Sequence, residues 1–599
     1  MHRLLTYPFP TFGLGRSLGW RFALAPLALL LLFVSRASAQ WASESYPLVA
    51  GWNAIWLPID CSDRTIGAIF NGTQVVEVWQ WNPTPSGGFT VSPSTPTQAN
   101  VEWRQWTQGA GGATLGALTG NAAYLIHVAD SAAQFTLTLT GKPLPPSLPW
   151  NNSGVNLVGF PTVSSGPPHF YDFLKLSNVL QGNPAIFQYV GGALSSTAPK
   201  NPNLVSQPAT TLINRNQAYW VQSTTYTSYY GPLAVTVSGQ QMLDFGTSSA
   251  NLTIQIKNVT DPAQGKSIVA TLTPAASVAP PPGQAAVAGA VPLMVQSALN
   301  PTTGGFTYSP LTSSYSTVSL APGQFVNVVL AVDRSSLAGA AGAVSQSLLK
   351  ITDSLGYTSV NLGVRATTSS FDGVWTGTAT VTNVDEVLSA QSVVNGNPIT
   401  DANGQPVAAV ATNPVTGVTS PFAVKLVLFA GGGGSQLLQQ VFIVNDANNV
   451  PHATKTEAGI NAISVAAGSV PGRLSTAFFP PGPQGQPGVY GPGGPFSLNG
   501  SLTYNVPLLA GASTNPFLHE YHPDHGPTNS YAVNRAVTLT FQPTLTGVSD
   551  TDPNWGSTTL GGAYQETVTG LRAAANGGGV KVSGTFVLHR VNSASTLQP

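Results

Sequence analysis

Runs in which apolar residues take every second position recur along the chain, and they predict β-strands. Residues 135–139 read Phe-Thr-Leu-Thr-Leu, and residues 233–237 read Leu-Ala-Val-Thr-Val. This alternation is typical of strands that bury one face and expose the other. The segments 65–70 and 170–174 are short enough to form one or two helical turns. We therefore expect an all-β, multidomain protein.

A repeated sequence in the first part of the chain indicates two tandem units. Residues 51–58, Gly-Trp-Asn-Ala-Ile-Trp-Leu-Pro, match residues 154–161, Gly-Val-Asn-Leu-Val-Gly-Phe-Pro, at an offset of 103. Further matches follow in the same order, between 79–81 and 187–189 and between 123–126 and 218–221. Self-similarity of this kind is a sign of repeated folding units. We expect two mostly β units, at residues 40–142 and 143–238.

The order of these segments resembles repeats found in bacterial exported surface proteins. The shared pattern is Gly-Trp-Asn-x-x-x-Leu-Pro, followed by an aromatic strand and then by a strand containing Tyr, Trp and Val. The resemblance covers about a third of the chain. It implies an exported surface-type protein and carries no known chemistry.

The next segment, residues 239–367, has the marks of a β-sandwich. It opens with Leu-Asp-Phe-Gly at 243–246, and it continues with a strand that ends at Asn258 and a Pro-Gly turn at 322–323. A later strand ends in Asp333-Arg334. This order resembles the immunoglobulin-like sandwich of the bacterial BACON type, although an Ala/Pro-rich insertion interrupts it. The resemblance implies a spacer or carbohydrate-facing module.

Residues 368–599 predict a C-terminal β-sandwich or barrel. Strand-like runs stand at its two ends, at 373–381 and 580–588, and their pairing would remove exposed sheet edges. Between them, the runs 422–429 and 436–444 predict a hairpin with four glycines in its turn. A phosphate-binding loop would instead lead into a helix and carry a Lys.

The first 39 residues predict a secretory signal. An apolar run from Phe22 to Val34 follows an Arg-containing stretch, and Ala37-Ser38-Ala39 supplies a small-residue cleavage pattern. The alternative is a transmembrane anchor, but the run has 13 residues where a span needs about 20. We expect export through the secretory pathway, to the periplasm, the outer surface or the extracellular medium, with no transmembrane anchor after cleavage.

Charged residues are scarce, and this excludes several classes of function. Of 599 residues, 22 are Lys or Arg and 22 are Asp or Glu. Signal removal takes away four Arg, leaving 18 basic and 22 acidic residues, so the chain has no basic excess for binding nucleic acid. The single cysteine, Cys61, excludes an internal disulfide. We expect Cys61 to be a small buried apolar residue, with a catalytic thiol as the alternative.

One cluster of ionisable residues stands out, His519-Glu520-Tyr521-His522-Pro523-Asp524-His525. Imidazole and carboxylate ligands suit zinc or another divalent metal, and His519, His522, Asp524 and His525 are the candidate ligands. The spacing differs from the helical zinc-protease motif, and Pro523 would break such a helix. The alternative is a structural loop whose side chains satisfy backbone groups. Catalysis is a third interpretation, and the sequence assigns no catalytic residue.

A second pattern is the set of tryptophans in the first unit, Trp52, Trp56, Trp79, Trp81, Trp103 and Trp106. Exposed Trp rows bind sugar rings by stacking, whereas buried ones form core. Trp79 and Trp81 lie two apart on a predicted strand and so share a face. Their match to Phe187 and Tyr189 in the second unit favours core packing over a glycan platform.

These observations favour an exported binding or structural protein of adhesion type, without catalytic activity and without a cofactor. Its expected partners are an extracellular glycan or other surface proteins. The alternative is a secreted metal-dependent hydrolase that acts on glycan or peptide through His519–His525. A third interpretation is one subunit of a larger surface assembly.

Metal analysis of the purified mature protein separates these interpretations. If the cluster binds zinc, the protein carries a stoichiometric amount, and His522→Ala loses it because one imidazole ligand is gone. A metal-free protein whose folding is unchanged by the substitution would contradict the metal site.

Overall fold

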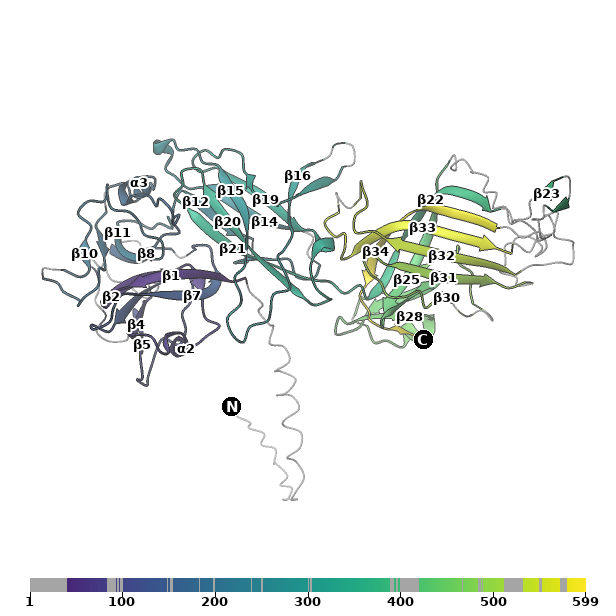
Figure 1. The fold of residues 1–599 in the computed structure, drawn as a ribbon, viewed down its shortest axis with the longest axis horizontal. Coiled ribbons are helices and arrows are strands. Elements are labelled where there is room, and N and C mark those ends of the chain that lie inside the picture. The colour runs from purple at the N-terminus through teal and green to yellow at the C-terminus, as the bar shows by residue number, and fades with distance from the viewer. Residues whose placement is uncertain are drawn as a thin grey trace, which may run out of the picture. The chain divides into compact units, whose positions relative to one another are not determined.

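The computed structural model describes residues 40–599 with internal gaps. The gaps are residues 83–92, 94–95, 97–100, 148, 151–153, 183, 198–199, 239, 249–250, 300, 302–303, 388–392, 395–396, 399–419, 466, 483–485, 487, 511–531, 549–551 and 571–578. Strands dominate the described part, which confirms the all-β, multidomain prediction (Figure 1). The helical turns expected at 65–70 and 170–174 are present as α2 (Ile66–Phe70) and α3 (Phe170–Leu174).

The first repeat is built from two sheets with a core between them. One sheet has the order β2-β6-β4-β5, and the other has the order β1-β7-β3. Their bounds are β1 (Ala42–Leu48), β2 (Gly51–Leu57), β3 (Ile59–Asp60), β4 (Val75–Trp81), β5 (Trp103–Thr107), β6 (Ala122–Val128) and β7 (Phe135–Pro143). Thr65 caps α2 by accepting a hydrogen bond from the backbone N–H of Ala68. Ile66 and Phe70 of this helix join the core, together with Tyr46 and Cys61.

The second repeat has one sheet that matches the larger sheet of the first. Its order is β10-β9-β11-β8, with α3 packed into the same core. The bounds are β8 (Gly154–Gly159), β9 (Ile186–Gln188), β10 (Asn203–Leu204) and β11 (Ala218–Ser223). The predicted closing strand of this repeat is β12 (Leu233–Val237), and it pairs with β14 (Asn251–Asn258) of the sandwich that follows. The chain thus passes into the sandwich through a shared sheet.

Aromatic side chains join the two repeats in one hydrophobic core. Trp81 and Trp103 of the first repeat meet Trp220 of the second edge-on, with ring centroids 5.5 and 6.3 Å apart. Large aromatic rings bury more apolar surface than any other side chains, so they dominate the stability of such an interface. Every residue of β2 is buried, because Trp52, Ala54 and Trp56 face this shared core while Ile55 and Leu57 face the core of the first repeat.

The repeats meet closely at Trp56 and Gly159, which occupy equivalent positions in the two copies. A Cβ placed on Gly159 would overlap the Cβ of Trp56. The second copy therefore needs a residue with no side chain where the first has the largest. Nearby, the backbone N–H of Trp56 donates to the carbonyl of Asn216 at 2.8 Å, and that of Trp52 donates to Gly192 at 2.9 Å. These bonds cover the outer edge of β2.

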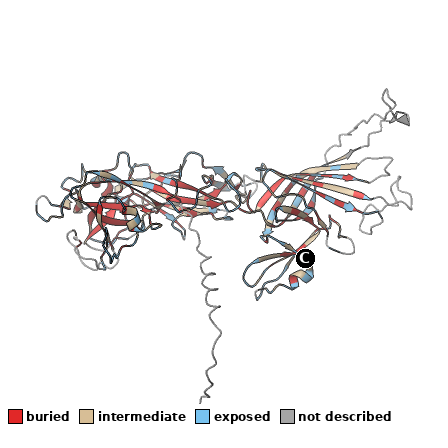
Figure 2. Ribbon diagram, turned by 60° about the horizontal axis from the view of Figure 1, so that its bottom comes forward, coloured by how far each residue is buried: buried red, intermediate tan, exposed pale blue. Residues whose placement is uncertain are grey.

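The third part is a β-sandwich of two five-stranded sheets. The sheet orders are β12-β14-β19-β16-β17 and β13-β21-β20-β15-β18, and the core lies between them. The bounds are β13 (Leu243–Asp244), β15 (Ala270–Ala276), β16 (Leu293–Leu299), β17 (Phe306–Pro310), β18 (Tyr315–Ser316), β19 (Phe325–Val332), β20 (Val344–Asp353) and β21 (Ser359–Thr367), with short 3₁₀ turns η2 (Pro262–Gln264) and η3 (Arg334–Ser336). In Figure 2 the buried residues concentrate along such strands.

The residues that marked the sandwich in the sequence hold its strands together. Asn258 is fully buried, and its side-chain amide donates to the carbonyls of Lys266 and Leu320 at 2.8 and 2.9 Å. Arg334 is also buried and donates to the carbonyl of Phe245 at 2.8 Å. Buried polar groups of this kind satisfy backbone carbonyls that no strand ladder reaches.

The C-terminal part is built on an eight-stranded sheet of order β30-β26-β25-β22-β34-β33-β32-β31. Its bounds are β22 (Gly373–Val387), β25 (Phe422–Gly431), β26 (Gly434–Leu438), β30 (Val489–Tyr490), β31 (Ser501–Leu508), β32 (Val533–Phe541), β33 (Thr559–Thr569) and β34 (Gly579–Asn592). β22 pairs with β34, which confirms the predicted pairing of the two ends. The Tyr504 hydroxyl on β31 donates to Ser435 Oγ on β26 at 2.8 Å, so the sheet curls and nearly closes around a filled apolar core.

The predicted glycine hairpin is confirmed, but its second run divides between two sheets. β25 and β26 pair around a turn in which Gly432 and Gly433 have φ angles of +62° and +78°. Positive φ angles at both central residues are typical of the two-residue turns that connect the strands of a β-hairpin. The chain then continues as β27 in a four-stranded sheet of order β29-β27-β28-β35. The remaining bounds are β23 (Val393–Val394), β24 (Asn397–Pro398), β27 (Gln440–Asn445), β28 (Pro451–Thr454), α4 (Glu457–Asn461), β29 (Gly472–Ser475) and β35 (Leu597–Gln598).

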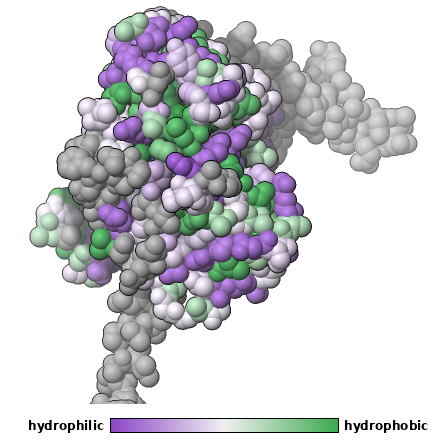
Figure 3. Space-filling view, turned by 90° about the vertical axis from the view of Figure 1, so that its left-hand side faces the viewer, coloured by the Kyte–Doolittle hydropathy of each residue, from purple (hydrophilic) through white to green (hydrophobic). Residues whose placement is uncertain are grey.

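The surface of the first part of the molecule mixes residue types. On the face that Figure 3 presents, hydrophobic residues lie in small groups between hydrophilic ones. No helix within the described ranges has both the length and the apolar character needed to cross a membrane.

The contact between Trp56 and Gly159 generates a test. Gly159→Ala should lower the free energy of unfolding by about 3 kcal/mol, because the new methyl group has no room against Trp56. Gly182→Ala is the matched control, since nothing lies within 4 Å of a Cβ placed there. Urea unfolding measures both variants. Equal stability of the two would contradict close packing of the repeats.

Candidate functional site

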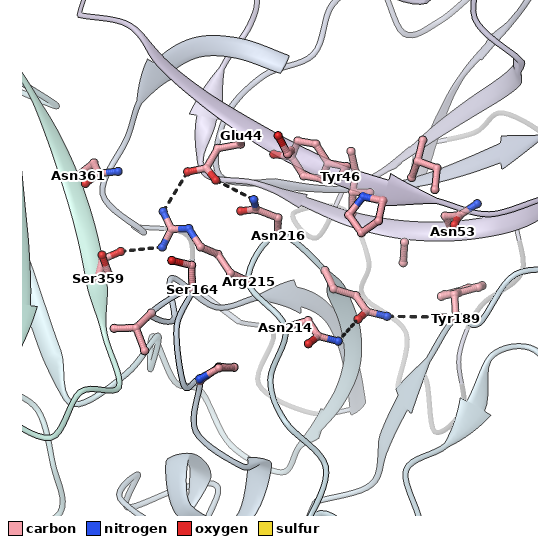
Figure 4. A pocket seen from close by; sticks show the side chains of 18 of the residues that line it. Glu44, Tyr46, Asn53, Ser164, Tyr189, Asn214, Arg215, Asn216, Ser359 and Asn361 are labelled. Atoms are coloured by element: carbon pink, nitrogen blue, oxygen red, sulfur yellow. Dashed lines mark hydrogen bonds and ion pairs between the residues drawn. The ribbon is translucent and has the colours of Figure 1, made fainter. Parts of the chain in front are cut away.

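The candidate site is a cavity of about 850 Å³ where the two repeats and the sandwich meet (Figure 4). Strands β1 and β2 of the first repeat form one wall, and loops 163–167 and 214–217 of the second repeat form another. Residues of β15, β20 and β21 in the sandwich complete it. Ligand cavities commonly have volumes of about 300–1,000 Å³ and lie between domains, so this one has the expected size and position.

An ion pair between Glu44 and Arg215 ties these three parts together. Arg215 Nη2 lies 3.0 Å from Glu44 Oε1, and Arg215 Nη1 donates to the carbonyl of Ser359 at 3.0 Å (Figure 4). Arg215 Nη1 also donates to the carbonyl of Thr162 at 2.9 Å. The side chains of Glu44 and Arg215 are only 11 and 14 % exposed. A charge this far from water needs a partner, and here each has one. The pair therefore fixes the cavity wall and leaves neither charge for a ligand.

Asn216 extends this wall into the core between the repeats. Its side-chain amide donates to Glu44 Oε2 at 2.7 Å, and its backbone carbonyl accepts from Trp56. Its φ angle is +70°, a left-handed conformation that Asn tolerates better than most residues. Asn216 thus couples the ion pair to the packing of Trp56.

Other amides around the cavity are also held by the protein. Asn53 accepts from the backbone N–H of Val49 at 3.0 Å and donates to the carbonyls of Val49 and Gly51 at 2.7 and 3.0 Å. Gln217 accepts from Asn214 at 3.1 Å and donates to the carbonyl of Tyr189 at 3.3 Å (Figure 4). The Asn of the repeat motif therefore shapes the turn before β2, and its role is structural.

Two buried polar atoms on cavity residues have no hydrogen-bond partner within the described part of the chain, the Tyr46 hydroxyl and Asn216 Oδ1. Burial, followed by the nearby Glu44 carboxylate, raises the pKa of Tyr46 well above its ordinary value, so the phenol stays protonated. Exposed or half-buried lining residues add further hydrogen-bonding groups, among them Ser164, Lys350 and Asn361. These hydroxyl, amide and ammonium groups suit a ligand rich in hydrogen-bonding groups.

The predicted metal ligands His519, His522, Asp524 and His525 lie outside the described residues. Within the part of the chain that is described, no group of three His, Cys, Asp or Glu side chains is placed to hold a metal ion. His127 stacks on Trp52 at 4.8 Å between ring centroids, and its Nδ1 lies 3.0 Å from Glu77 Oε1. It is a partly buried residue that is stacked on one side chain and paired with another.

The tryptophans of the first repeat confirm the core interpretation for five of the six. Trp52, Trp56, Trp79, Trp81 and Trp103 are 2 to 8 % exposed and belong to the core shared by the repeats. Trp79 and Trp81 face the same core, as their spacing predicts. Trp106 is less buried and packs against Phe70 at 5.6 Å between ring centroids.

Cys61 is fully buried in the core of the first repeat, as expected for a small apolar residue. Burial raises the pKa of its thiol to about 12. The nucleophilic form of cysteine is the thiolate, so this thiol is unsuited to catalysis near neutral pH.

The sequence did not point to the cavity residues. Glu44 and Arg215 are 171 positions apart, and no local motif joins them. The sequence held one signal for Glu44 and Arg215. Charged residues make up only 7 % of the chain, so a charged residue beside a predicted strand is unusual and is a candidate for a specific role.

Comparisons with known proteins do not identify a relative of this chain: no protein-family model matches it, and a search of curated proteins finds no match either.

The Glu44–Arg215 pair can be tested by substitution. Arg215→Met should cost about 3 kcal/mol of unfolding free energy, because it leaves the Glu44 carboxylate buried without its cation. Lys175→Met is the control, since Lys175 and Asp172 form a half-buried pair near the surface whose loss should cost less than about 1 kcal/mol. Urea denaturation compares the two. A cost for Arg215→Met no larger than for Lys175→Met would rule out a structural role for the buried pair.

Proposed function

We propose that this protein is an exported bacterial binding or structural protein that acts at the cell surface or beyond it, without catalytic activity. The N-terminal segment with its small-residue cleavage pattern supports export. The tandem repeats and the BACON-like order of residues 239–367 support a surface-type protein whose sandwich acts as a spacer or a carbohydrate-facing module. The periplasm, the outer surface and the extracellular medium are the compartments consistent with export.

The observation that carries the binding proposal is the cavity of about 850 Å³ at the junction of the repeats and the sandwich. Its expected partners are rich in hydroxyl groups, because Glu44 and Arg215 neutralise each other and the exposed or half-buried lining groups include hydroxyls and amides beside the ammonium of Lys350. An extracellular glycan meets this description, and a surface protein that presents a polar loop is the other partner class. Nucleic acid is disfavoured by the chain's lack of a basic excess.

The absence of catalysis is proposed from how two of the buried acids are used. Glu44 is paired with Arg215, and Glu566 is paired with Arg535 while accepting from the Tyr564 hydroxyl at 2.6 Å. A general acid or base must be able to exchange its proton with a substrate, and a carboxylate locked to a guanidinium is poorly suited to this.

The alternative proposal is a secreted metal-dependent hydrolase centred on His519–His525, with a divalent metal such as zinc held by His519, His522, Asp524 and His525. It rests on the concentration of imidazole and carboxylate groups in that segment. The metal analysis described above tests it.

Binding in the junction cavity can be blocked selectively. Ser164→Trp places an indole at the cavity wall and should abolish binding of whichever glycan the full chain recognises on an array. Ser165→Trp is the matched control, because Ser165 is an exposed neighbour that does not line the cavity. Loss of binding in both variants, or in neither, would contradict the assignment to this cavity. An array with no bound glycan would leave the structural role.

A further inference from the structure

The junction cavity carries a charge that the described part of the protein does not neutralise. Its charged lining residues are Glu44, Arg215 and Lys350. Glu44 and Arg215 form the buried ion pair, so their charges cancel within the wall. Lys350 is exposed, and in the described part of the chain it has no acidic partner within 4 Å. The lining therefore has a net positive charge, although the sequence after the predicted signal has an excess of acidic residues.

The fold places Lys350 on the face of the sandwich that meets the first repeat. Lys350 lies on β20 between Leu349 and Ile351, which are fully buried in the core of the sandwich. Successive side chains of a strand point to opposite faces, so Lys350 belongs to the outer face of its sheet. Leu348 is two residues earlier on that face and packs into the core of the first repeat. Lys350 therefore stands next to a packed contact between the sandwich and the first repeat, where it lines the cavity.

An amide side chain lies opposite Lys350. Asn361 is its direct neighbour in the antiparallel pairing of β20 with β21, on the strand that also carries Ser359 (Figure 4). Side chains at such positions have Cβ atoms about 5 Å apart, so both can contact one substituent of a ligand. Asn361 is half-buried, its side chain forms no hydrogen bond with another described residue, and its amide atoms are not enclosed. The amide is therefore accessible to a ligand in the cavity.

An ammonium beside an amide recognises an anionic substituent. The ammonium of lysine is a compact point charge that pairs with anionic oxygens without the fixed fork of arginine. The amide NH₂ group adds two further donors. The exposed lining residues Ser45, Ser164 and Asn214 supply hydroxyl and amide groups that suit the hydroxyls of a sugar. A ligand that meets all of these groups is a sugar with an acidic substituent.

We propose that the junction cavity binds an acidic glycan and that Lys350 and Asn361 hold its anionic group. This inference rests on the proposed binding function and specifies the class of ligand. The anionic group is a carboxylate, as in a uronic acid, or a sulfate ester, since a lysine ammonium pairs with either. The ion pair of Glu44 and Arg215 stays intact, and Lys350 supplies the charge that selects acidic over neutral sugars.

Isothermal titration calorimetry of the purified full chain tests the proposal with three disaccharides of one size. They are digalacturonic acid, galactobiose that carries a sulfate ester, and unmodified galactobiose as the neutral counterpart of both. We expect at least one acidic disaccharide to bind more tightly than galactobiose, and the one that does so identifies the anionic group. Raising NaCl from about 50 to about 500 mM should weaken binding of the acidic disaccharide alone, because salt screens an exposed ion pair.

Substitutions at the paired positions locate the charge. Lys350→Gln should weaken binding of the acidic disaccharide about fivefold and leave galactobiose unchanged, the size expected for an ion pair that water partly screens. Asn361→Asp keeps the shape of the side chain and places a carboxylate opposite Lys350, so it should remove the preference for the acidic ligand. Lys350→Arg retains the charge and should retain the preference. Lys257→Gln is the matched control, because Lys257 is an exposed lysine on β14 in the other sheet and does not line the cavity.

The outcomes separate this inference from the proposed function. Equal binding of acidic and neutral disaccharides, blocked in both cases by Ser164→Trp, would overturn the acidic ligand and leave a binding cavity. A preference that survives Lys350→Gln, or that Lys257→Gln weakens as much, would overturn the role of Lys350. Binding that Ser164→Trp does not reduce would exclude the cavity as the site, and the proposed binding there would fail with it. No binding of any of the three disaccharides would overturn the acidic-glycan assignment.

Discussion

The packing of Trp56 against Gly159 is the contact on which the first half of this protein depends. It brings the equivalent strands of two repeats together at positions that correspond in sequence, one copy supplying the indole and the other the space for it. The backbone of Trp56 then bonds to Asn216, and Asn216 bonds to Glu44, which pairs with Arg215. Arg215 finally reaches the sandwich through the carbonyl of Ser359. One apolar contact is thus linked, through Asn216, to the buried ion pair in the wall of the junction cavity.

Buried charged side chains in this protein have a polar partner, which is either a charge of opposite sign or a backbone group. Glu44 with Arg215 and Glu566 with Arg535 follow this rule, and so does Arg334, which satisfies the carbonyl of Phe245. Neutral side chains elsewhere also satisfy buried backbone groups. Asn53 and Asn258 donate hydrogen bonds to backbone carbonyls and so hold turns and strand ends in place. Because amides and hydroxyls can be buried at lower cost than ions, they shape the interior of the molecule, and the same groups remain available at the cavity walls.

Much of the fold could be predicted because its causes are local. The alternation of apolar and polar residues at 135–139 predicts a strand with one buried face. The pairing of β22 with β34 was predictable because strand-like runs stand at the two ends of the C-terminal segment, and their pairing removes exposed sheet edges. Other features depend on distant partners. β12 has the pattern of a closing strand in either repeat or sandwich, and only its bonding to β14 decides between them. The run 436–444 likewise looks continuous in sequence, yet β26 and β27 belong to different sheets.

The sequence by itself determined the class of the protein: strands throughout, an internal repeat, a thiol with no disulfide partner and no excess of basic residues. These properties depend on residue type and spacing, which the chain displays directly. Tertiary structure alone decided where cavities form. Glu44 and Arg215 become neighbours, and Trp56, Trp150 and Tyr230 enclose a space, only after the repeats pack together. A cavity is what remains between packed surfaces, so no single segment of the sequence contains it.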